Sequence, residues 1–172
     1  MTARQRTERD LAACVQVLAA VHEQDGYPSR WPADAPSWLS PTGLVGAWIA
    51  ETDHGVCGHI ALVGGVHDPQ LRAAVDAPAS DIVAVSRLFV DSAVRGRRVG
   101  ELLLRTATTF ATGHELQLVL DVVDSRRSAA IALYERLGWR LVGYRTAGWT
   151  TPDGVRPRLR LYALPSDAPR NE

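Results

Sequence analysis

VSRLFVDSAVRGRRVGELLL, the sequence from Val85 to Leu104, joins a strand-like run, a basic turn with two glycines, and the beginning of a helix pattern. A helix that opens this way aims several backbone N–H groups, and the positive end of its dipole, at one point. Such a point suits a phosphate or pyrophosphate group. Arg95, Arg97 and Arg98 add positive charge and bidentate hydrogen-bond donors. The stretch therefore predicts a phosphate-bearing ligand at the loop 95–100.

The length and composition predict one globular domain, over residues 1–164, followed by a polar tail at 165–172. The chain has 172 residues, is 46% hydrophobic and carries a formal net charge of zero. This hydrophobic content is sufficient for a real core. The balanced charge gives no general attraction to nucleic acid or to anionic lipid, so neither is expected as a partner.

The cysteines and the N-terminal segment predict a cytoplasmic protein without a metal site. Cys14 and Cys57 lie in apolar patterns, outside any CxxC or Cys/His cluster, and are typical of reduced, buried thiols. Residues 1–10 are polar and do not resemble a signal peptide. The sequence has no apolar run of membrane-spanning length.

The periodicity of apolar residues predicts an α/β protein. We expect a mixed, largely antiparallel central sheet of about six to seven strands, flanked by about four helices. Strands and helices do not alternate throughout, which excludes a doubly wound dinucleotide fold. Residues 67–80, which contain Pro69, Pro78 and many alanines, are expected to form an insertion. The predicted helices cover about 11–24, 98–111 and 128–137, with a short helix near 37, and the predicted strands cover 43–51, 56–63, 81–90, 115–123, 139–147 and 158–164.

Two motifs occur together in the second half of the chain. The first is the R-G-x-x-x-G element at Arg95–Gly100, which matches neither a dinucleotide-binding nor a Walker pattern. The second is A-x-x-L-Y-E-x-L-G-W at Ala130–Trp139. In combination the two motifs resemble the GNAT superfamily of acyl-CoA-dependent N-acetyltransferases. The resemblance implies a GNAT-like fold, with acetyl-CoA as cosubstrate, no metal, and a primary amine on a small molecule or peptide as acceptor.

The resemblance also implies how the cofactor is held. Backbone N–H groups from Arg97 to Glu101 would bind the pyrophosphate, and the end of the preceding strand would pair with the pantetheine amides. Arg98 stands where the family signature has its first glycine, and Arg127 where many relatives have an asparagine. The implied cofactor contacts are Leu88, Phe89, Val90, Arg95, Gly96, Arg97, Arg98, Val99, Gly100, Glu101 and Arg127.

Tyr134 falls on the tyrosine that serves many relatives as general acid. A neutral tyrosine, with a pKa of about 10, can protonate a leaving thiolate whose conjugate acid has a pKa of about 8.5. A backbone N–H near Val90 is the expected oxyanion donor. The sequence leaves the general base open among His59, Glu51, His22, Asp25 and a chain of waters.

The segment 25–41, rich in proline and tryptophan, occupies the place where relatives build an acceptor wall. Trp38 belongs to it, Trp149 is a candidate for the opposite wall, and packing against the core is the alternative role for these aromatics. A homodimer through the C-terminal hairpin and a monomer both remain open. Other interpretations are a catalytically weak CoA-binding sensor or scaffold, or an acyltransferase with another acyl group or acceptor. The candidate substrate contacts are Asp25, Tyr27, Arg30, Trp31 and His59.

Overall fold

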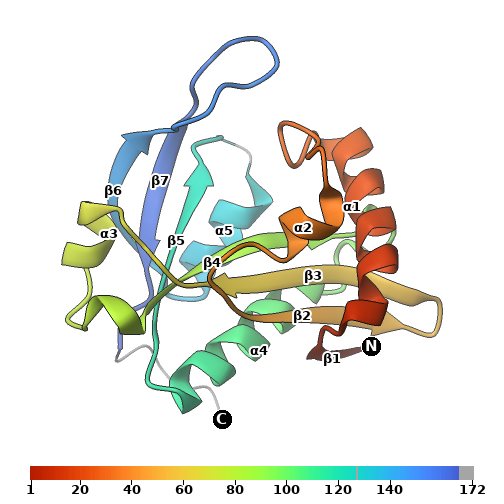
Figure 1. The fold of residues 1–172 in the computed structure, drawn as a ribbon, viewed down its shortest axis with the longest axis horizontal. Helices are drawn as coiled ribbons and strands as arrows, with labels where there is room; N and C mark the ends of the chain where they lie inside the picture. The colour runs from red at the N-terminus through yellow and green to blue at the C-terminus, as the bar shows by residue number, and fades with distance from the viewer. Residues whose placement is uncertain (127, 167–172) are drawn as a thin grey trace. The chain divides into compact units, whose positions relative to one another are not determined.

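The computed structural model describes residues 1–126 and 128–166 (Figure 1). Three 3-10 turns, η1 (Glu8–Asp10), η2 (Ala79–Asp81) and η3 (Ser92–Val94), accompany the helices. The helices are α1 (Leu11–Asp25), α2 (Ala35–Leu39), α3 (Pro69–Ala73), α4 (Val99–Gly113) and α5 (Ala129–Arg136). The strands are β1 (Thr2–Gln5), β2 (Leu44–Thr52), β3 (Gly55–Val63), β4 (Ile82–Val90), β5 (Gln117–Val123), β6 (Arg140–Thr146) and β7 (Arg158–Ala163).

The strands form a seven-stranded mixed sheet in the order β1-β2-β3-β4-β5-β7-β6. β4 and β5 pair in parallel. The pairs β1–β2, β2–β3, β5–β7 and β6–β7 are antiparallel. The predicted fold class is therefore confirmed. Within the described ranges, no helix is long and apolar enough to cross a membrane.

The chain forms two compact units. The first unit comprises residues 1–63 and 85–110, and the second comprises 64–84 and 111 onward. The break falls inside β4, so the end of this strand belongs to the first unit. The same unit holds the phosphate loop, the loop 95–100 that the sequence predicts to bind phosphate. The beginning of β4 and α5 belong to the second. Each unit is described below by itself.

In the first unit, the β2–β3 hairpin buries both of its faces. Ile49 lies in the same apolar cluster as Cys14 and Leu18 of α1. Its neighbour Trp48 points to the opposite face, where its ring lies 5.0 Å from the ring of Phe110 in α4. This alternation follows from the two-residue period of a strand, and it places α1 and α4 on opposite faces of the hairpin.

A glycine on β3 sets the position of the first turn of α4. A Cβ added at Gly58 would lie 3.2 Å from Cγ1 of Val99 and 3.0 Å from Cδ1 of Leu103. Both contacts are closer than real Cβ atoms usually make. The absence of a side chain at Gly58 therefore lets the beginning of α4, with its backbone N–H groups, pack directly on the strand.

In the second unit, the segment 67–80 contains a helix that the sequence analysis did not predict. Asp68 caps α3 by accepting hydrogen bonds from the N–H groups of Gln70 and Leu71, at 2.9 and 3.0 Å. Pro69 occupies the first helical position, where its missing N–H costs nothing. Leu71 belongs to a buried cluster with residues of the sheet. The predicted insertion therefore contains a helix that packs against the sheet.

Candidate functional site

The loop between β4 and α4 combines two left-handed residues. Asp91 caps the η3 turn by accepting a hydrogen bond from the N–H of Ala93, at 2.9 Å. Gly96 then adopts φ +78° and Arg98 adopts φ +57°. The next residue, Val99, is buried and begins the helix. The two reversals turn the chain so that α4 starts directly behind the loop.

The first turn of α4 offers backbone N–H groups that have no acceptor in the described part of the chain. The N–H of Leu102 makes the first bond back to the loop, to the carbonyl of Arg98 at 3.0 Å. Those of Arg98, Val99 and Gly100 precede it and make none. An arginine before the helix cannot accept from these donors as a Ser or Asp would. The N–H of Arg97 bonds to the Val94 carbonyl at 3.3 Å, so the predicted donor set loses this group.

Arg98 adopts a left-handed backbone conformation, which glycine takes more readily than a residue with a side chain. The left-handed region brings Cβ close to the following carbonyl oxygen, at a cost of roughly 1–2 kcal/mol for an L-residue. The Arg98 side chain is exposed. An arginine at the position of the signature glycine therefore adds backbone strain to the loop.

Two predicted site residues from distant parts of the chain form an ion pair. Arg95 of the loop donates through Nη2 to a carboxylate oxygen of Asp25, the last residue of α1. The exposed fractions of the two side chains are 55% and 34%. This pair ties the end of α1 to the phosphate loop and occupies part of the Arg95 guanidinium.

The end of β4 is half-buried, as a strand edge that pairs with a ligand must be. Leu88 and Val90 are partly exposed, whereas Phe89 is buried against α1. The Phe89 ring stacks on the imidazole of His59, with a centroid distance of 5.2 Å and an interplanar angle of 17°. Phe89 was predicted as a cofactor contact at the end of β4, and its side chain lies in the core.

His59 is fully buried and uses both ring nitrogens. Nδ1 lies 2.9 Å from the carbonyl of Arg87, so it carries the proton. Nε2 then accepts a hydrogen bond from Nη1 of Arg6 at 3.0 Å. Burial lowers the pKa of His59 to about 4. The imidazole is thus neutral and has no nitrogen left for an amine proton, which argues against the predicted roles as base and substrate contact.

The other candidates for the general base differ in whether their proton-accepting atoms already have hydrogen-bond partners. Arg4 holds both carboxylate oxygens of Glu51, at 3.2 and 3.1 Å. Asp25 is paired with Arg95. Nδ1 of His22 lies 2.7 Å from the Pro28 carbonyl, which places the proton on this nitrogen. Nε2 of His22 thus keeps a lone pair that forms no hydrogen bond among the residues the structure describes.

The predicted acceptor segment is partly packed and partly open. The Tyr27 ring lies edge-on to that of Trp38, with centroids 6.1 Å apart. Trp31 lies 5.4 Å from the His22 ring and is 42% exposed. Arg30 is exposed. Tyr27 therefore packs inward with Trp38, while Trp31 and Arg30 remain available to a ligand.

In the second unit, Tyr134 lies on α5 with its ring held by two other aromatics. Ser128 caps this helix by accepting a hydrogen bond from the N–H of Ile131 at 3.2 Å. Tyr134 is buried, and its ring centroid lies 5.8 Å from that of Trp139 and 6.2 Å from that of Tyr162. The ring is thus fixed by packing. The predicted cofactor contact Arg127 lies outside the described residues.

The two cysteines are free and buried. Burial raises the pKa of Cys14 to about 11 and also raises the pKa of Cys57. Both thiols are therefore protonated at neutral pH. A protonated, buried thiol is a poor nucleophile.

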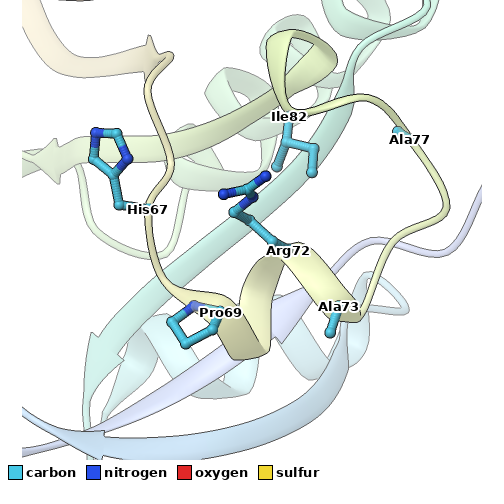
Figure 2. A pocket seen from close by; sticks show the side chains of 6 residues that line it. All are labelled: His67, Pro69, Arg72, Ala73, Ala77 and Ile82. Atoms are coloured by element: carbon cyan, nitrogen blue, oxygen red, sulfur yellow. The ribbon is translucent and has the colours of Figure 1, made fainter.

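A pocket of about 360 Å³ lies in the second unit, beside α3 (Figure 2). The side chain of Arg72 extends from the helix toward Ile82. None of the predicted site residues lines this pocket. Its lining consists of His67, Pro69, Arg72, Ala73, Ala77 and Ile82.

Comparison with known proteins establishes the family. The model of the acetyltransferase (GNAT) domain matches residues 45–141, which is more than half of the chain. The matched range contains the loop 95–100, α4 and α5. The chain therefore belongs to the GNAT acetyltransferase family.

Individual proteins are similar at lower identity. Human N-acetyltransferase 8 is 28% identical over 131 residues, covering 76% of this chain and 54% of the relative, so the chain spans about half of that protein. The ribosomal-protein-S18-alanine N-acetyltransferase of Escherichia coli superposes with a TM-score of 0.71 at 20% identity, covering 99% of this chain and 97% of that chain. The Salmonella typhimurium protein yncA, solved with its cofactor acetyl-CoA, gives 0.71 at 19% identity, covering 99% and 96%. These two structures share the fold.

Proposed function

We propose that the protein transfers the acetyl group of acetyl-CoA to a primary amine. The observation that carries the proposal is that the N–H groups of Arg98, Val99 and Gly100 have no acceptor in the described part of the chain, which belongs to the GNAT family. A helix start with N–H groups that lack acceptors is a binding site for phosphate. The similar Salmonella protein solved with acetyl-CoA supports this choice of cofactor.

In this proposal the N–H groups of Arg98, Val99 and Gly100 bind the pyrophosphate. The Arg97 and Arg98 side chains add positive charge, and the edge of β4 at Leu88 and Val90 pairs with the pantetheine amides. The cofactor is thus held mainly by backbone groups, whose positions follow from the fold. Arg95 contributes charge to the same loop through its position beside Gly96.

The transfer proceeds by direct attack. The amine nitrogen forms a bond to the thioester carbonyl carbon, and the carbon–sulfur bond then breaks. Tyr134 donates its hydroxyl proton to the leaving sulfur, and the amine loses a proton to a base. His22 is the proposed base, acting directly or through water, because its Nε2 carries a lone pair that forms no hydrogen bond in the described chain. The raised pKa of both cysteines argues against an acyl-enzyme on sulfur.

A thermal-shift titration joined to a thiol-release assay tests the proposal. Acetyl-CoA is expected to raise Tm progressively as its concentration exceeds Kd, because binding to the folded state stabilises it by RT ln(1 + [L]/Kd). Acetyl-CoA with a panel of primary amines is expected to release free thiol. Other acyl-CoA thioesters in the same assay determine which acyl group is used.

The two measurements separate the interpretations. If acetyl-CoA leaves Tm unchanged, the phosphate-binding interpretation of α4 is wrong. If Tm rises but no amine, peptide or alcohol supports thiol release, the protein is a CoA-binding sensor or scaffold. If an alcohol rather than an amine supports release, the fold and cofactor stand and the acceptor class changes.

A further inference from the structure

Arg87, in the middle of β4, has a guanidinium that is fixed in position by its neighbours. Its Nε–H donates to the carbonyl of Trp38, and Nη1 donates to Oγ of Ser86 at 2.6 Å. The centre of the guanidinium lies 4.8 Å from the centroid of the Trp38 ring, within cation–π range. Two hydrogen bonds and an aromatic face therefore hold this half-buried side chain in one orientation.

The positive charge of Arg87 has no carboxylate partner in the described chain. Every partner named above is neutral. Half-buried charges are ordinarily paired, because their removal from water is costly. Burial accordingly lowers the pKa of Arg87 from its usual value, while the phenol of Tyr27 acts in the opposite direction. Arg87 thus bears the desolvation cost of a buried ion without the usual compensation.

The unused hydrogen-bond donors of Arg87 point to a ligand. Both hydrogens of Nη2 lack an acceptor among the residues described, and this nitrogen is not closed off from solvent. The second half-buried arginine of this region, Arg6, differs. It donates to the Leu39 carbonyl at 2.7 Å, to Oγ of Ser40 at 2.6 Å and to His59, so both of its terminal nitrogens are used. Of these two arginines, only Arg87 has a terminal nitrogen that donates to no described residue.

The backbone of Arg87 is held in a strained conformation. Its φ is +53°, which is unusual for an arginine inside a strand. His59 Nδ1 donates a hydrogen bond to the carbonyl oxygen of Arg87 at 2.9 Å, which helps to hold this backbone conformation. Such strain persists where the surroundings over-determine it, and it concentrates at functional sites. The next residues of β4, Leu88 to Val90, form the proposed pantetheine edge.

We propose that Arg87 binds the carboxylate of the acceptor, so that the acceptor is an amine that also carries a carboxylate group, such as an amino acid. The planar edge of a guanidinium matches the two oxygens of a carboxylate in a bidentate pair. A bound carboxylate would also supply the missing counter-charge. Trp38, whose ring faces the guanidinium, orients Arg87. This inference rests on the proposed acetyl transfer and specifies its acceptor.

The test compares acceptors that differ only in the carboxylate. Amino acids and the corresponding amino-acid amides are assayed with acetyl-CoA for thiol release, with the wild type, Arg87→Met and Arg87→Lys. Arg9→Met is the matched control, because Arg9 is an exposed arginine of the same unit. Comparing the acid-to-amide ratio between variants cancels the difference in amine pKa between the two acceptor types.

The wild type is expected to favour the acid form. Arg87→Met should lower kcat/KM for acids by about tenfold to hundredfold, mainly through KM, and leave the amides within about twofold. Arg87→Lys, which keeps the charge but loses the planar edge, should retain part of the preference. Arg9→Met should keep the wild-type ratio. A Tm increase with acetyl-CoA shows that each variant is folded.

Two results would overturn the inference. The first is an acid-to-amide ratio that is the same in the wild type and in Arg87→Met. This result leaves the proposed acetyl transfer standing, because amines are still acetylated. The second is the absence of thiol release with every acceptor, which removes the proposed transfer and this inference together.

Discussion

Two regions of the first unit each contain an arginine with a left-handed backbone, and they use it in opposite ways. At the start of α4, Arg98 adopts φ +57° and its side chain is exposed, and among the residues described the N–H groups of Arg98, Val99 and Gly100 have no acceptor. On β4, Arg87 adopts φ +53°, its carbonyl is bonded to His59, and its side chain is held by Trp38 and Ser86. The first region offers main-chain donors to a ligand, whereas the second offers a positioned side chain.

This difference predicts how each region responds to substitution. A site made of backbone N–H groups keeps its donors when side chains change, provided that the chain keeps its course. A site made of one oriented side chain depends on every neighbour that orients it. The cofactor region is therefore expected to tolerate side-chain changes, and the region around Arg87 is expected to be sensitive to them.

The largest effect is expected from a residue outside both regions. If the two regions bind the substrates and Tyr134 acts in the chemical step, Tyr134→Phe should lower kcat by about 10²–10⁴-fold. The ring contacts with Trp139 and Tyr162 are retained by phenylalanine, so Kd for acetyl-CoA should change by less than about twofold. Thiol-release kinetics and a thermal-shift titration measure the two quantities.

Tyr144→Phe is the matched control, because Tyr144 is an exposed tyrosine on β6. It should behave as the wild type in both measurements. A Tyr134→Phe protein whose kcat stays within about twofold of the wild-type value would remove Tyr134 from the proton transfer.

The next largest effect is expected at His59, whose Nδ1 donates a hydrogen bond to the carbonyl of Arg87. His59→Phe keeps a ring against Phe89 but removes both nitrogens, which leaves the Arg87 carbonyl and one donor of Arg6 without partners. A neutral hydrogen bond contributes about 0.5–1.5 kcal/mol and one with a charged partner about 1.5–3 kcal/mol, so the loss of these two bonds should lower the free energy of unfolding by about 2–4.5 kcal/mol. Urea unfolding measures this change, and a loss below about 0.5 kcal/mol would show that the network does not stabilise the fold.

The same residue predicts a pH dependence. The pKa of His59 falls from its ordinary value of 6.5 to about 4 in the folded protein. Between these values the unfolded chain binds a proton that the folded chain does not. The contribution of His59 to stability is therefore fully present above pH 6.5 and is lost as the pH falls toward 4, by about 3 kcal/mol.

Unfolding curves at several pH values check this sign. His59→Phe should lack this part of the dependence between pH 6.5 and 4, whereas His54→Gln, a change at an exposed turn histidine, should keep it. A wild-type slope of the opposite sign would mean that His59 is charged in the folded protein.

A smaller effect is expected at Arg98. Substitutions there distinguish pyrophosphate binding by backbone N–H groups from binding by the Arg98 guanidinium. Arg98→Gly removes the left-handed strain and should raise the free energy of unfolding by up to about 1 kcal/mol. Arg98→Ala retains φ +57° and should bring no such gain. If the backbone holds the pyrophosphate, Kd for acetyl-CoA should rise less than about threefold in both variants. A rise above tenfold would assign the contact to the guanidinium.

The contrast between the regions also explains what the sequence could predict. The turn from β4 into α4 was predictable because a strand, glycines and a helix start lie within twenty consecutive residues, and their backbone geometry follows locally. The arginine at a signature glycine, Arg98, indicated the position where the structure has a positive φ. The fold class followed from the periodicity of apolar residues, whereas α3 was not predicted within the segment 67–80.

The region around Arg87 was not predicted, because its contacts join residues far apart in the chain. Arg6, Leu39, His59 and Arg87 lie on four different segments and share no motif. The register of β3, which decides the face of His59, is fixed by its pairing with Ile49 rather than by its own sequence. The predicted role of His59 as a base therefore depended on information that only the fold provides.

The smallest effect concerns the ion pair that ties the phosphate loop to α1. Asp25→Asn removes a negative charge beside Arg95 and should alter the free energy of unfolding by less than about 0.5 kcal/mol, because exposed pairs contribute little. The released Arg95 can then turn to the pyrophosphate, so Kd for acetyl-CoA should fall about two- to threefold at low salt, with a smaller change at high salt. Glu23→Gln, an exposed acid on the same helix, is the control for general charge. Weaker acetyl-CoA binding by Asp25→Asn would instead mean that Asp25 positions Arg95 for the cofactor, and the loop would then depend on an oriented side chain as the Arg87 region does.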